Sequence, residues 1–260
     1  MLPGIYGPPA PPDWTDLLAA TCVRHGDDAV AVLDTAAALH GLPLPWPPAS
    51  DVHVALRPGQ EQVQRPGFCF HTWKLLADEI CVVGDQPVTT LERTVVDLLC
   101  LRDRLSAVAV LDSLLHDRRL TVADLRRLRA ATTRRRGAAR SRDWWLEADG
   151  RAESPLETRV RLRAIDGGYP PDDLQRRFDL DPGVAKVDLA WRMPDGRWLA
   201  VEADGVGWHS TPRALYVDRA RSNALAGRGD VVTARTVWAD TVRPDGIPRL
   251  LRRFLGPPRR

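Results

Sequence analysis

The chain has 260 residues, of which 44% are hydrophobic and 27% are charged, and its 37 basic side chains face 34 acidic ones. This composition excludes collagen, a coiled coil and a fully disordered chain, and the length suits one large domain or two small ones. The net charge of +3 permits nucleic-acid binding without requiring it. Only Lys74 and Lys186 are lysines, and this preference for arginine is read as GC-rich coding, with selection for phosphate contacts as the alternative.

No stretch reaches the roughly 18 apolar residues needed to cross a bilayer, and the proline-rich N-terminus lacks the pattern of a signal peptide. We therefore expect a cytoplasmic protein with no membrane partner. The four cysteines are scattered, with no C-x-x-C pair and no histidine at zinc-finger spacing. They predict neither a disulfide framework nor a zinc site, and we interpret all four as buried thiols: Cys22, Cys69, Cys81 and Cys100.

The first half predicts helices around a small sheet. After an irregular arm, apolar spacing from Trp14 to His40 predicts two short helices that end at Gly41. Strand-like runs at 52–56, 68–73 and 80–83 predict a small antiparallel sheet. The pattern Thr89-x-x-Glu92 predicts a helix over LERTVVDLLCL. A second helix carries Leu105 to Leu115, and a third begins at Thr121.

An arginine-rich stretch then interrupts the apolar pattern between residues 126 and 151. Such a stretch cannot build an apolar core, so we expect a linker or a solvated helix end, and a candidate phosphate-contacting patch. The predicted organisation is an α+β domain over 1–130, a linker over 131–151 and a second domain over 152–260. The candidate DNA-contacting side chains are Arg134, Arg135 and Arg136 in this stretch, and Arg219, Arg221 and Arg235 in the second domain.

The second half mixes helices and strands. Ser154-Pro155-Leu156-Glu157 predicts a helix start, with serine as N-cap and proline in the first helical position. Strands at 187–191 and 198–203 are joined by the turn Pro194-Asp195-Gly196, and a helix at 212–226 and a strand at 231–238 follow. The whole chain is therefore predicted to be an α/β (mixed α+β) protein.

Acidic side chains gather on the predicted hairpin. Alternation along a strand puts Glu202 and Asp204 on one face. It also groups Lys186, Asp188 and Ala190 opposite Val187, Leu189 and Trp191. In simple register Asp188 meets Glu202 and Asp204. Three converging carboxylates repel one another unless a cation neutralises them, and such hard oxygen ligands favour Mg²⁺ or Mn²⁺.

Two further side chains extend this set. Glu157, on the preceding helix, offers a fourth oxygen, and His209 follows the hairpin where an imidazole can orient or protonate a phosphate. Each member alone has a simpler explanation. Glu157 fits the N3 position of a capping box, Asp204 precedes Gly205 as a turn former would, and a single histidine is more often structural. The combination, rather than any member, points to metal-dependent chemistry.

These motifs resemble a known superfamily. V-D-L-A-W (187–191), V-E-A-D-G (201–205) and W-H (208–209) resemble the PD-(D/E)XK nucleases, in the branch related to very-short-patch-repair endonucleases that is represented in actinobacterial proteins. D-R-A-R-S-N-A-L (218–225) and V-V-T-A-R-T-V-W-A-D (231–240) are similar to the same branch. The resemblance covers roughly residues 152 to 256.

The resemblance implies a restriction-endonuclease-like mixed sheet flanked by helices, which hydrolyses DNA phosphodiesters with Mg²⁺ or Mn²⁺. It implies Asp188 as the central metal ligand, Glu202 as the second acidic ligand, Glu157 as the helix acid and His209 as the histidine after the tryptophan. Asp204 departs from the pattern, because the general motif has lysine there and the repair enzymes have histidine. Lys186, two residues before Asp188, is therefore our hypothesis for the missing positive charge.

The first half resembles a second family, the AbiEi-type antitoxins and regulators. T-A-A-A-L-H-G-L (35–42), V-H-V-A-L (52–56) and V-V-G-D-Q-P-V-T-T-L-E-R-T-V-V-D-L (82–98) carry this resemblance. It implies a transcriptional regulator with a winged helix, although L-P-G-I-Y beside Met1 resembles the tail of the wing, so the helix-turn-helix is expected to be missing. The alternative function is thus a non-catalytic regulator or antitoxin that binds DNA or a partner protein such as a cognate toxin. A partner-interaction module is a third reading, and the oligomeric state stays open.

Overall fold

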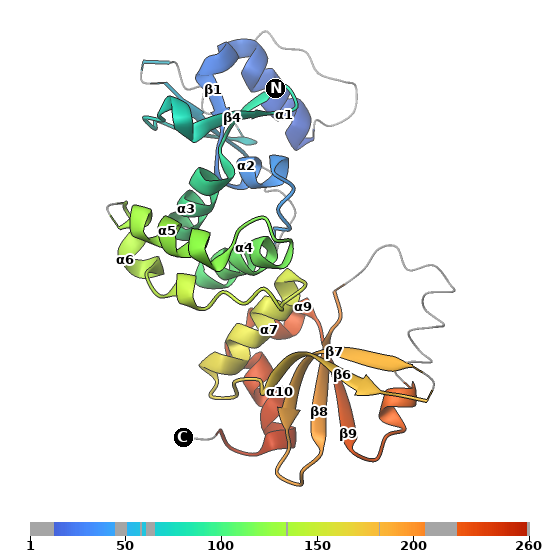
Figure 1. Cartoon of the computed structure of the whole chain (residues 1–260). Helices are drawn as coiled ribbons and strands as arrows, with labels where there is room; N and C mark the ends of the chain where they lie inside the picture. Colours follow the sequence, from blue (N-terminus) through green and yellow to red (C-terminus); the bar gives the residue numbers. More distant parts are fainter. Residues whose placement is uncertain are drawn as a thin grey trace. The chain divides into compact units, whose positions relative to one another are not determined.

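The computed structural model describes residues 13–44, 51–57, 59–60, 66–133, 135–181, 183–205 and 223–258. The chain is a mixed α/β protein with one mixed sheet of five strands and another of four. It divides into two compact units, Met1–Ala148 and Asp149–Arg260. The first unit carries the blue to yellow-green elements of Figure 1, and the second carries the yellow to red ones.

The first unit begins with a sheet and two helices: α1 (Trp14–His25), η1 (Gly26–Asp28), β1 (Ala29–Ala31), α2 (Leu33–Leu39), β2 (Val52–Leu56), β3 (Phe68–His71), η2 (Ala77–Glu79), β4 (Ile80–Val83) and β5 (Gln86–Thr89). A helical part follows: α3 (Leu91–Leu101), α4 (Arg104–His116), α5 (Val122–Thr132), α6 (Ala138–Ser141) and η3 (Trp144–Leu146). The strand order is β3-β2-β1-β5-β4. One core lies between this sheet and α1, and a second lies among α2, α3, α4 and α5.

The prediction of a small antiparallel sheet in this unit was wrong. β2 and β3 run parallel, β1 and β5 pair in parallel at Ala31 and Val88, and only β1–β2 and β4–β5 are antiparallel. β1 lies within the 14–40 segment whose apolar spacing predicts helix, and all three of its residues are buried. A strand that is buried on both faces has no alternation to distinguish it from an apolar helix.

The predicted helix over LERTVVDLLCL is confirmed as α3, with Thr90 rather than Thr89 as its cap. Thr90 is the N-cap, and its hydroxyl accepts a hydrogen bond from the Arg93 amide. Thr89 instead ends β5, where its hydroxyl hydrogen-bonds to that of Thr94. The third helix has the predicted capping box at Thr121, which is reciprocated by Asp124. A threonine pair at a strand–helix junction therefore lets the first member finish the strand and the second cap the helix.

The structure places the predicted 131–151 linker differently. Residues up to Ala148 belong to the first unit, and Trp145 on η3 is only 5% exposed within the helical core. Gly137 allows the chain to turn back toward the helical core. Its φ of 91° is positive, and a Cβ at this position would lie 2.1 Å from the Cys100 carbonyl oxygen. The abundant arginines make this stretch look like a linker in the sequence. Trp145, however, packs into the helical core, as a linker residue would not.

The second unit contains α7 (Pro155–Asp166), β6 (Asp173–Asp179), β7 (Val184–Arg192), β8 (Trp198–Ala203), β9 (Val231–Thr236), α9 (Trp238–Val242) and α10 (Gly246–Leu255). Its strand order is β6-β7-β8-β9, with β8 and β9 parallel and the other pairs antiparallel. The predicted hairpin is confirmed as β7–β8, whereas β6, α9 and α10 were not predicted. Residues 223–226 are helical, and the rest of the predicted 212–226 helix lies outside the described residues.

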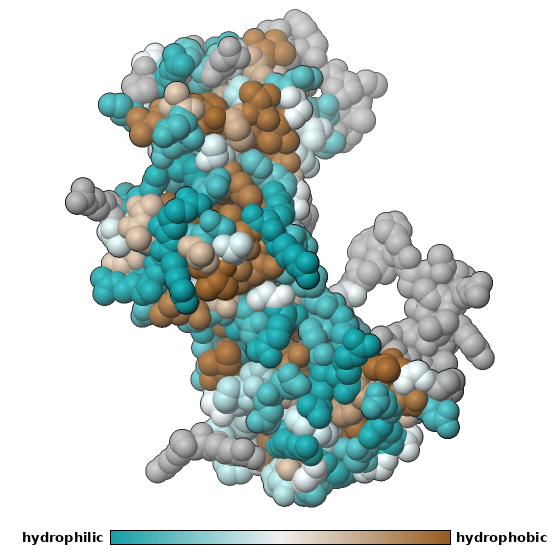
Figure 2. Space-filling model, viewed as in Figure 1, coloured by the Kyte–Doolittle hydropathy of each residue, from teal (hydrophilic) through white to brown (hydrophobic). Residues whose placement is uncertain are grey.

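Two apolar layers enclose the second sheet. α7 and α10 pack on one face through a core that includes Leu156, Val160 and Leu251. Leu225 packs on a second core with Val187 and other strand residues. Hydrophilic residues predominate on the face of this unit seen in Figure 2. Among the described residues, no helix has the length and apolarity to cross a membrane.

Candidate functional site

Glu157 is held at the start of α7 by local bonds. Ser154 caps the helix by accepting a hydrogen bond from the Glu157 amide. The Glu157 residue is only 7% exposed, and its Oε2 accepts from the Glu153 amide at 2.9 Å and from Gln175 Nε2 at 2.7 Å. A capping box would direct this carboxylate to the amide of Ser154. The bond to Gln175 instead ties the acid to the sheet.

The strand alternation breaks at Asp188. Leu189 and Trp191 share the core beneath α7, but Val187, which was predicted to share their face, lies with Ala190 in the other core. The predicted grouping of Ala190 with Asp188 was therefore wrong. Asp188 and Gln175 lie between the register pairs Leu174–Leu189 and Arg176–Val187 and are themselves unpaired in it, and the φ of Gln175, +56°, is in the left-handed region. Such a backbone irregularity changes the direction of neighbouring side chains, and it brings together groups that a regular pleat would place on opposite faces.

The Asp188 carboxylate lies where two strands part. The paired register of β7 and β8 ends at Leu189 opposite Val201. One step further, Asp188 Oδ2 accepts a hydrogen bond from the Ala203 amide at 2.8 Å, so the side chain replaces a backbone acceptor. The Gln175 amide also lowers the pKa of Asp188, so it lies close to that carboxylate as well. Gln175 thus links the β7 acid to the helix acid Glu157, a role that sequence patterns gave no reason to expect.

Burial raises the pKa of both acids. The pKa of Asp188 is raised mainly by desolvation, against the Ala203 hydrogen bond and the nearby Gln175 amide, which lower it. The pKa of Glu157 is likewise raised first by desolvation, and repulsion from Asp188 and Glu153 adds to this. Two buried carboxyl groups held beside each other favour any ligand that brings positive charge.

Glu202 and Asp204 share one cation, which the sequence did not predict. Arg235, on the neighbouring strand β9, lies 3.5 Å from Glu202 and 3.2 Å from Asp204. Both acids therefore lie on the same side of the sheet, as predicted. Arg235 was predicted to contact DNA, and its side chain is 49% exposed while it holds the two carboxylates.

Lys186 is also paired. Its Nζ lies 2.6 Å from Glu153 Oε1, and both side chains are about two-fifths exposed. Lys186 contributes to lowering the pKa of Asp188, so its charge reaches the acid that it was predicted to assist. An exposed pair of this kind is worth little to stability. Replacement of Glu153 by another partner of Lys186 therefore costs little free energy.

The donor set fits a hard divalent cation in its chemistry. Asp188, Glu157 and Glu202 supply carboxylate oxygens, and the buried Oε1 of Gln175 has no hydrogen-bond partner among the described atoms. In the described part of the chain, no three of these carboxylates bring oxygens within 4.8 Å of one another. His209, Arg219 and Arg221 fall within 206–222 and lie outside the described residues, as does Arg134.

Glu157→Gln is expected to stabilise the metal-free protein by about 1 kcal/mol at neutral pH. Both bonds to the carboxylate use one oxygen, so the amide keeps that acceptor and loses the repulsion. Because the folded pKa of Glu157 is raised, the wild type loses stability as pH rises from the ordinary carboxyl value through the raised one.

Urea unfolding at several pH values tests this. The difference between variant and wild type should vanish below about pH 4, where both forms are uncharged. A difference that is constant with pH would contradict the assignment of repulsion at this site.

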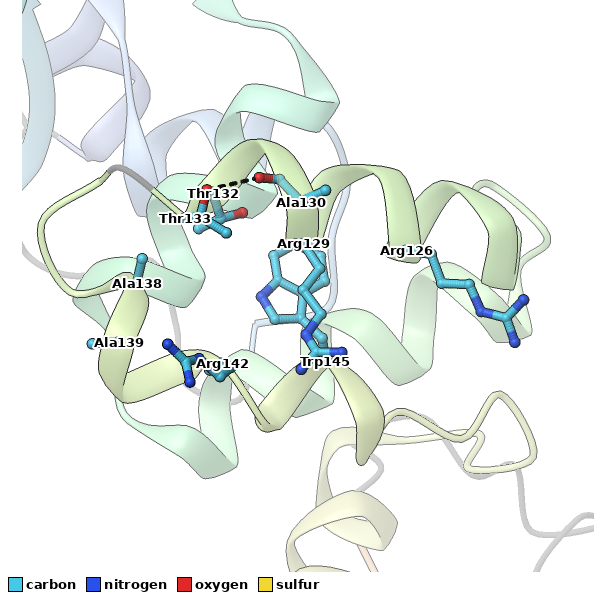
Figure 3. A pocket seen from close by; sticks show the side chains of 9 residues that line it. All are labelled: Arg126, Arg129, Ala130, Thr132, Thr133, Ala138, Ala139, Arg142 and Trp145. Atoms are coloured by element: carbon cyan, nitrogen blue, oxygen red, sulfur yellow. Dashed lines mark hydrogen bonds between the residues drawn. The ribbon is translucent and has the colours of Figure 1, made fainter.

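The arginine-rich stretch forms a pocket of about 440 Å³ in the first unit. Figure 3 shows Arg126 and Arg129 extending from α5, with Trp145 and Arg142 contributed by the returning chain. None of the described residues that line it is acidic. By contrast, Arg135, a predicted DNA contact, is paired with Glu79 and Asp97 at 3.0 and 3.2 Å. Arg136 is exposed.

Comparisons with known proteins give two curated relatives. These are "Uncharacterized protein MT2308" and "Uncharacterized protein Rv2248", from Mycobacterium tuberculosis strains CDC 1551 / Oshkosh and ATCC 25618 / H37Rv. Each is 34% identical over 219 residues, which is 84% of this chain and 78% of the relative. No protein-family model matches the chain, and no solved structure matches it.

Proposed function

The chain belongs to one family with the Mycobacterium tuberculosis proteins MT2308 and Rv2248, and for this member we propose a metal-dependent endonuclease that hydrolyses DNA phosphodiester bonds. The observation that carries the proposal is the linked set of Asp188, Gln175 and Glu157, with Glu202 on the adjoining strand. In this proposal the second unit has the restriction-endonuclease-like fold of the PD-(D/E)XK superfamily. The names of the two relatives state no activity, so the proposal rests on the site.

The acids have separate duties in this proposal. Asp188 and Glu202 are the principal ligands of Mg²⁺ or Mn²⁺, and Glu157 and Asp204 complete the acidic set. When bound, the metal polarises the phosphate and lowers the pKa of a coordinated water. Gln175 keeps Glu157 oriented through its hydrogen bond to Oε2, and its amide lies close to Asp188. Supporting hydrogen bonds of this kind fix the ligands before a metal arrives.

Lys186 and Arg235 supply positive charge for the phosphate. Lys186 exchanges Glu153 for a phosphate oxygen, and His209 completes the proposed catalytic set as orienting group or acid. Arg235 contributes a guanidinium on the other side, where it already compensates Glu202 and Asp204. Lys186→Met should therefore reduce the cleavage rate while leaving metal affinity nearly unchanged, and an unchanged rate would remove Lys186 from the catalytic set.

The first experiment incubates the purified protein with supercoiled plasmid and with mismatch-containing duplex, in Mg²⁺, in Mn²⁺ and in excess chelator. The expected result is nicking or linearisation that requires the metal. Mn²⁺ binding measured by electron paramagnetic resonance gives a second readout, independent of the choice of DNA. Absence of both metal binding and cleavage would overturn the proposal.

A second candidate function is favoured by the arginine pocket of Figure 3, namely DNA binding by an AbiEi-like regulator or antitoxin without catalysis. The double variant Arg126→Gln/Arg142→Gln should weaken DNA binding and lower the salt slope by about one for each phosphate that the protein no longer neutralises. Fluorescence anisotropy over a salt series measures this. Tight salt-dependent binding that depends on these arginines, with no cleavage in any metal, would favour the regulator.

A further inference from the structure

Three metal-ligating side chains meet in the first unit, whereas the carboxylates of the proposed nuclease site belong to the second. His53, Cys69 and His71 each offer a ligand atom, and these atoms all lie within 4.8 Å of one another. Among the described residues they form the single group of three or more such side chains. The two imidazoles are stacked with 5.3 Å between their centroids, and His53 Nδ1 lies 3.0 Å from His71 Nε2.

Strand register explains why these residues meet. β2 and β3 pair in parallel, with His53 beside Cys69 and Ala55 beside His71. Side chains of registered neighbours and of alternate residues on one strand project from the same face. Cys69-x-His71 therefore places both ligands next to His53. The sequence signal exists, but it differs from zinc-finger spacing, and the parallel pairing that uses it was not predicted.

The surroundings keep these imidazoles in the neutral form, in which a ring nitrogen can bind a metal. Trp73 covers His71, with 4.8 Å between ring centroids. Arg102 lies 3.5 Å from His53 Nε2, and its guanidinium is anchored by the buried carboxylate of Asp34. Burial, followed by the charges of His53 and Arg102, lowers the pKa of His71 to about 4. Neutral imidazoles keep the lone pairs that metal coordination needs.

We propose that His53, Cys69 and His71 bind Zn²⁺ as a three-ligand site with a fourth position left for water. One thiolate and two imidazoles match the borderline-soft preference of Zn²⁺ rather than that of Mg²⁺. Tetrahedral Zn–N bonds of about 2.05 Å put the two nitrogens roughly 3.4 Å apart, so the rings separate by only a few tenths of an ångström. β3 lies at the edge of its sheet, where such a shift disturbs one neighbour.

The proton balance is simple. The Cys69 thiol loses its proton to solvent when the Zn–S bond forms, and the proton shared by the two imidazoles moves to His53 Nε2, from which the Arg102 N–H then turns away. Binding therefore releases about one proton per metal ion, and the apparent affinity rises with pH. No oxidant or reductant takes part.

Co²⁺ titration of the full chain tests the site, because Co²⁺ substitutes for Zn²⁺ and is coloured. The expected spectrum has a thiolate-to-cobalt charge-transfer band in the near ultraviolet and the d–d bands of tetrahedral cobalt, with one equivalent bound. Zn²⁺ should displace the signal stoichiometrically. Mg²⁺ should not displace it, which separates this site from the carboxylate site.

Two variants and one control complete the experiment. Cys69→Ser should remove the charge-transfer band, and His71→Gln should weaken binding by about 100-fold or more. Cys81→Ser is the matched control, since Cys81 is also a partly buried thiol and lies on β4 at the other edge of the same sheet. Circular dichroism confirms that each variant is folded.

Retention of the full cobalt spectrum by folded Cys69→Ser would overturn the proposal, as would a spectrum without a charge-transfer band in the wild type. Should Cys69→Ser fail to fold, His71→Gln and Cys69→Ala decide the question. Asp188→Asn should bind Zn²⁺ like the wild type, so failure of the nuclease proposal leaves this result unaffected.

Discussion

Asp188→Asn is expected to lower metal-dependent DNA cleavage by about 1,000-fold, equivalent to some 4 kcal/mol of transition-state stabilisation. The amide keeps an oxygen that can accept the Ala203 N–H bond, so the strand geometry should survive. It removes the negative charge that a divalent cation needs. Glu202→Gln should have an effect of the same order, because the second ligand lies on the strand that parts from β7 at this point.

Single-turnover cleavage in Mg²⁺ and Mn²⁺ measures the effect, with Mn²⁺ affinity measured in parallel. Asp195→Asn is the control, since Asp195 is an exposed turn residue of the same hairpin whose carboxylate is paired with Arg197. It should cleave like the wild type. Cleavage by Asp188→Asn at more than a tenth of the wild-type rate would remove Asp188 from the proposed centre.

Gly137→Ala is expected to destabilise the first unit by about 4 kcal/mol or more. A Cβ on Gly137 would lie 2.1 Å from the Cys100 carbonyl oxygen, in a backbone region with φ of +91° that disfavours side chains. That oxygen also accepts a hydrogen bond from Arg140 at 3.1 Å, so a shift of the turn disrupts this bond as well. The turn that brings Trp145 back to the helical core would then be disrupted.

Urea unfolding followed by tryptophan fluorescence and circular dichroism measures this destabilisation, with a transition fitted for each unit. Gly84→Ala serves as control because it also has positive φ but meets no atom within 4 Å, so it should cost only about 1 kcal/mol. Gly246→Ala, whose Cβ would lie 2.0 Å from the Asp240 oxygen, should instead affect the second unit. Similar losses of unfolding free energy for Gly84→Ala and Gly137→Ala would contradict the prediction, because they would show that the structure relieves the clash at Gly137.

Apolar periodicity located most helices and strands of this chain, but not how the strands of the first sheet pair. α3 was predicted with the bounds that it has, because buried leucines recur on one face and a threonine caps the start. β1 was missed since burial on both faces erases alternation, and β6 since its polar face dominates the sequence. Strand direction in the first sheet also depends on long-range pairing, about which local patterns carry little information.

The acids of the candidate site were found because residue type and spacing suffice to place them on a hairpin. The side chains that position these acids were not predicted. Gln175 acts through a positive φ that no pattern indicates in a non-glycine residue. The prediction that all four cysteines are buried was wrong for three of them, which are partly exposed, and only Cys100 is buried. Their interpretation as buried thiols gave no reason to expect metal-ligating neighbours around Cys69.

The scarcity of lysine turns Lys186 into a spectroscopic probe. Reductive methylation with isotopically labelled formaldehyde marks lysine amines and the amino terminus, and this chain has only Lys74 and Lys186 to mark. The resonance of Lys186 senses its ion pair with Glu153, whereas exposed Lys74 in the first unit serves as an internal reference. Titration with Mg²⁺ or with DNA can then be followed at the edge of the acidic site from one signal, without assignment of the remaining spectrum.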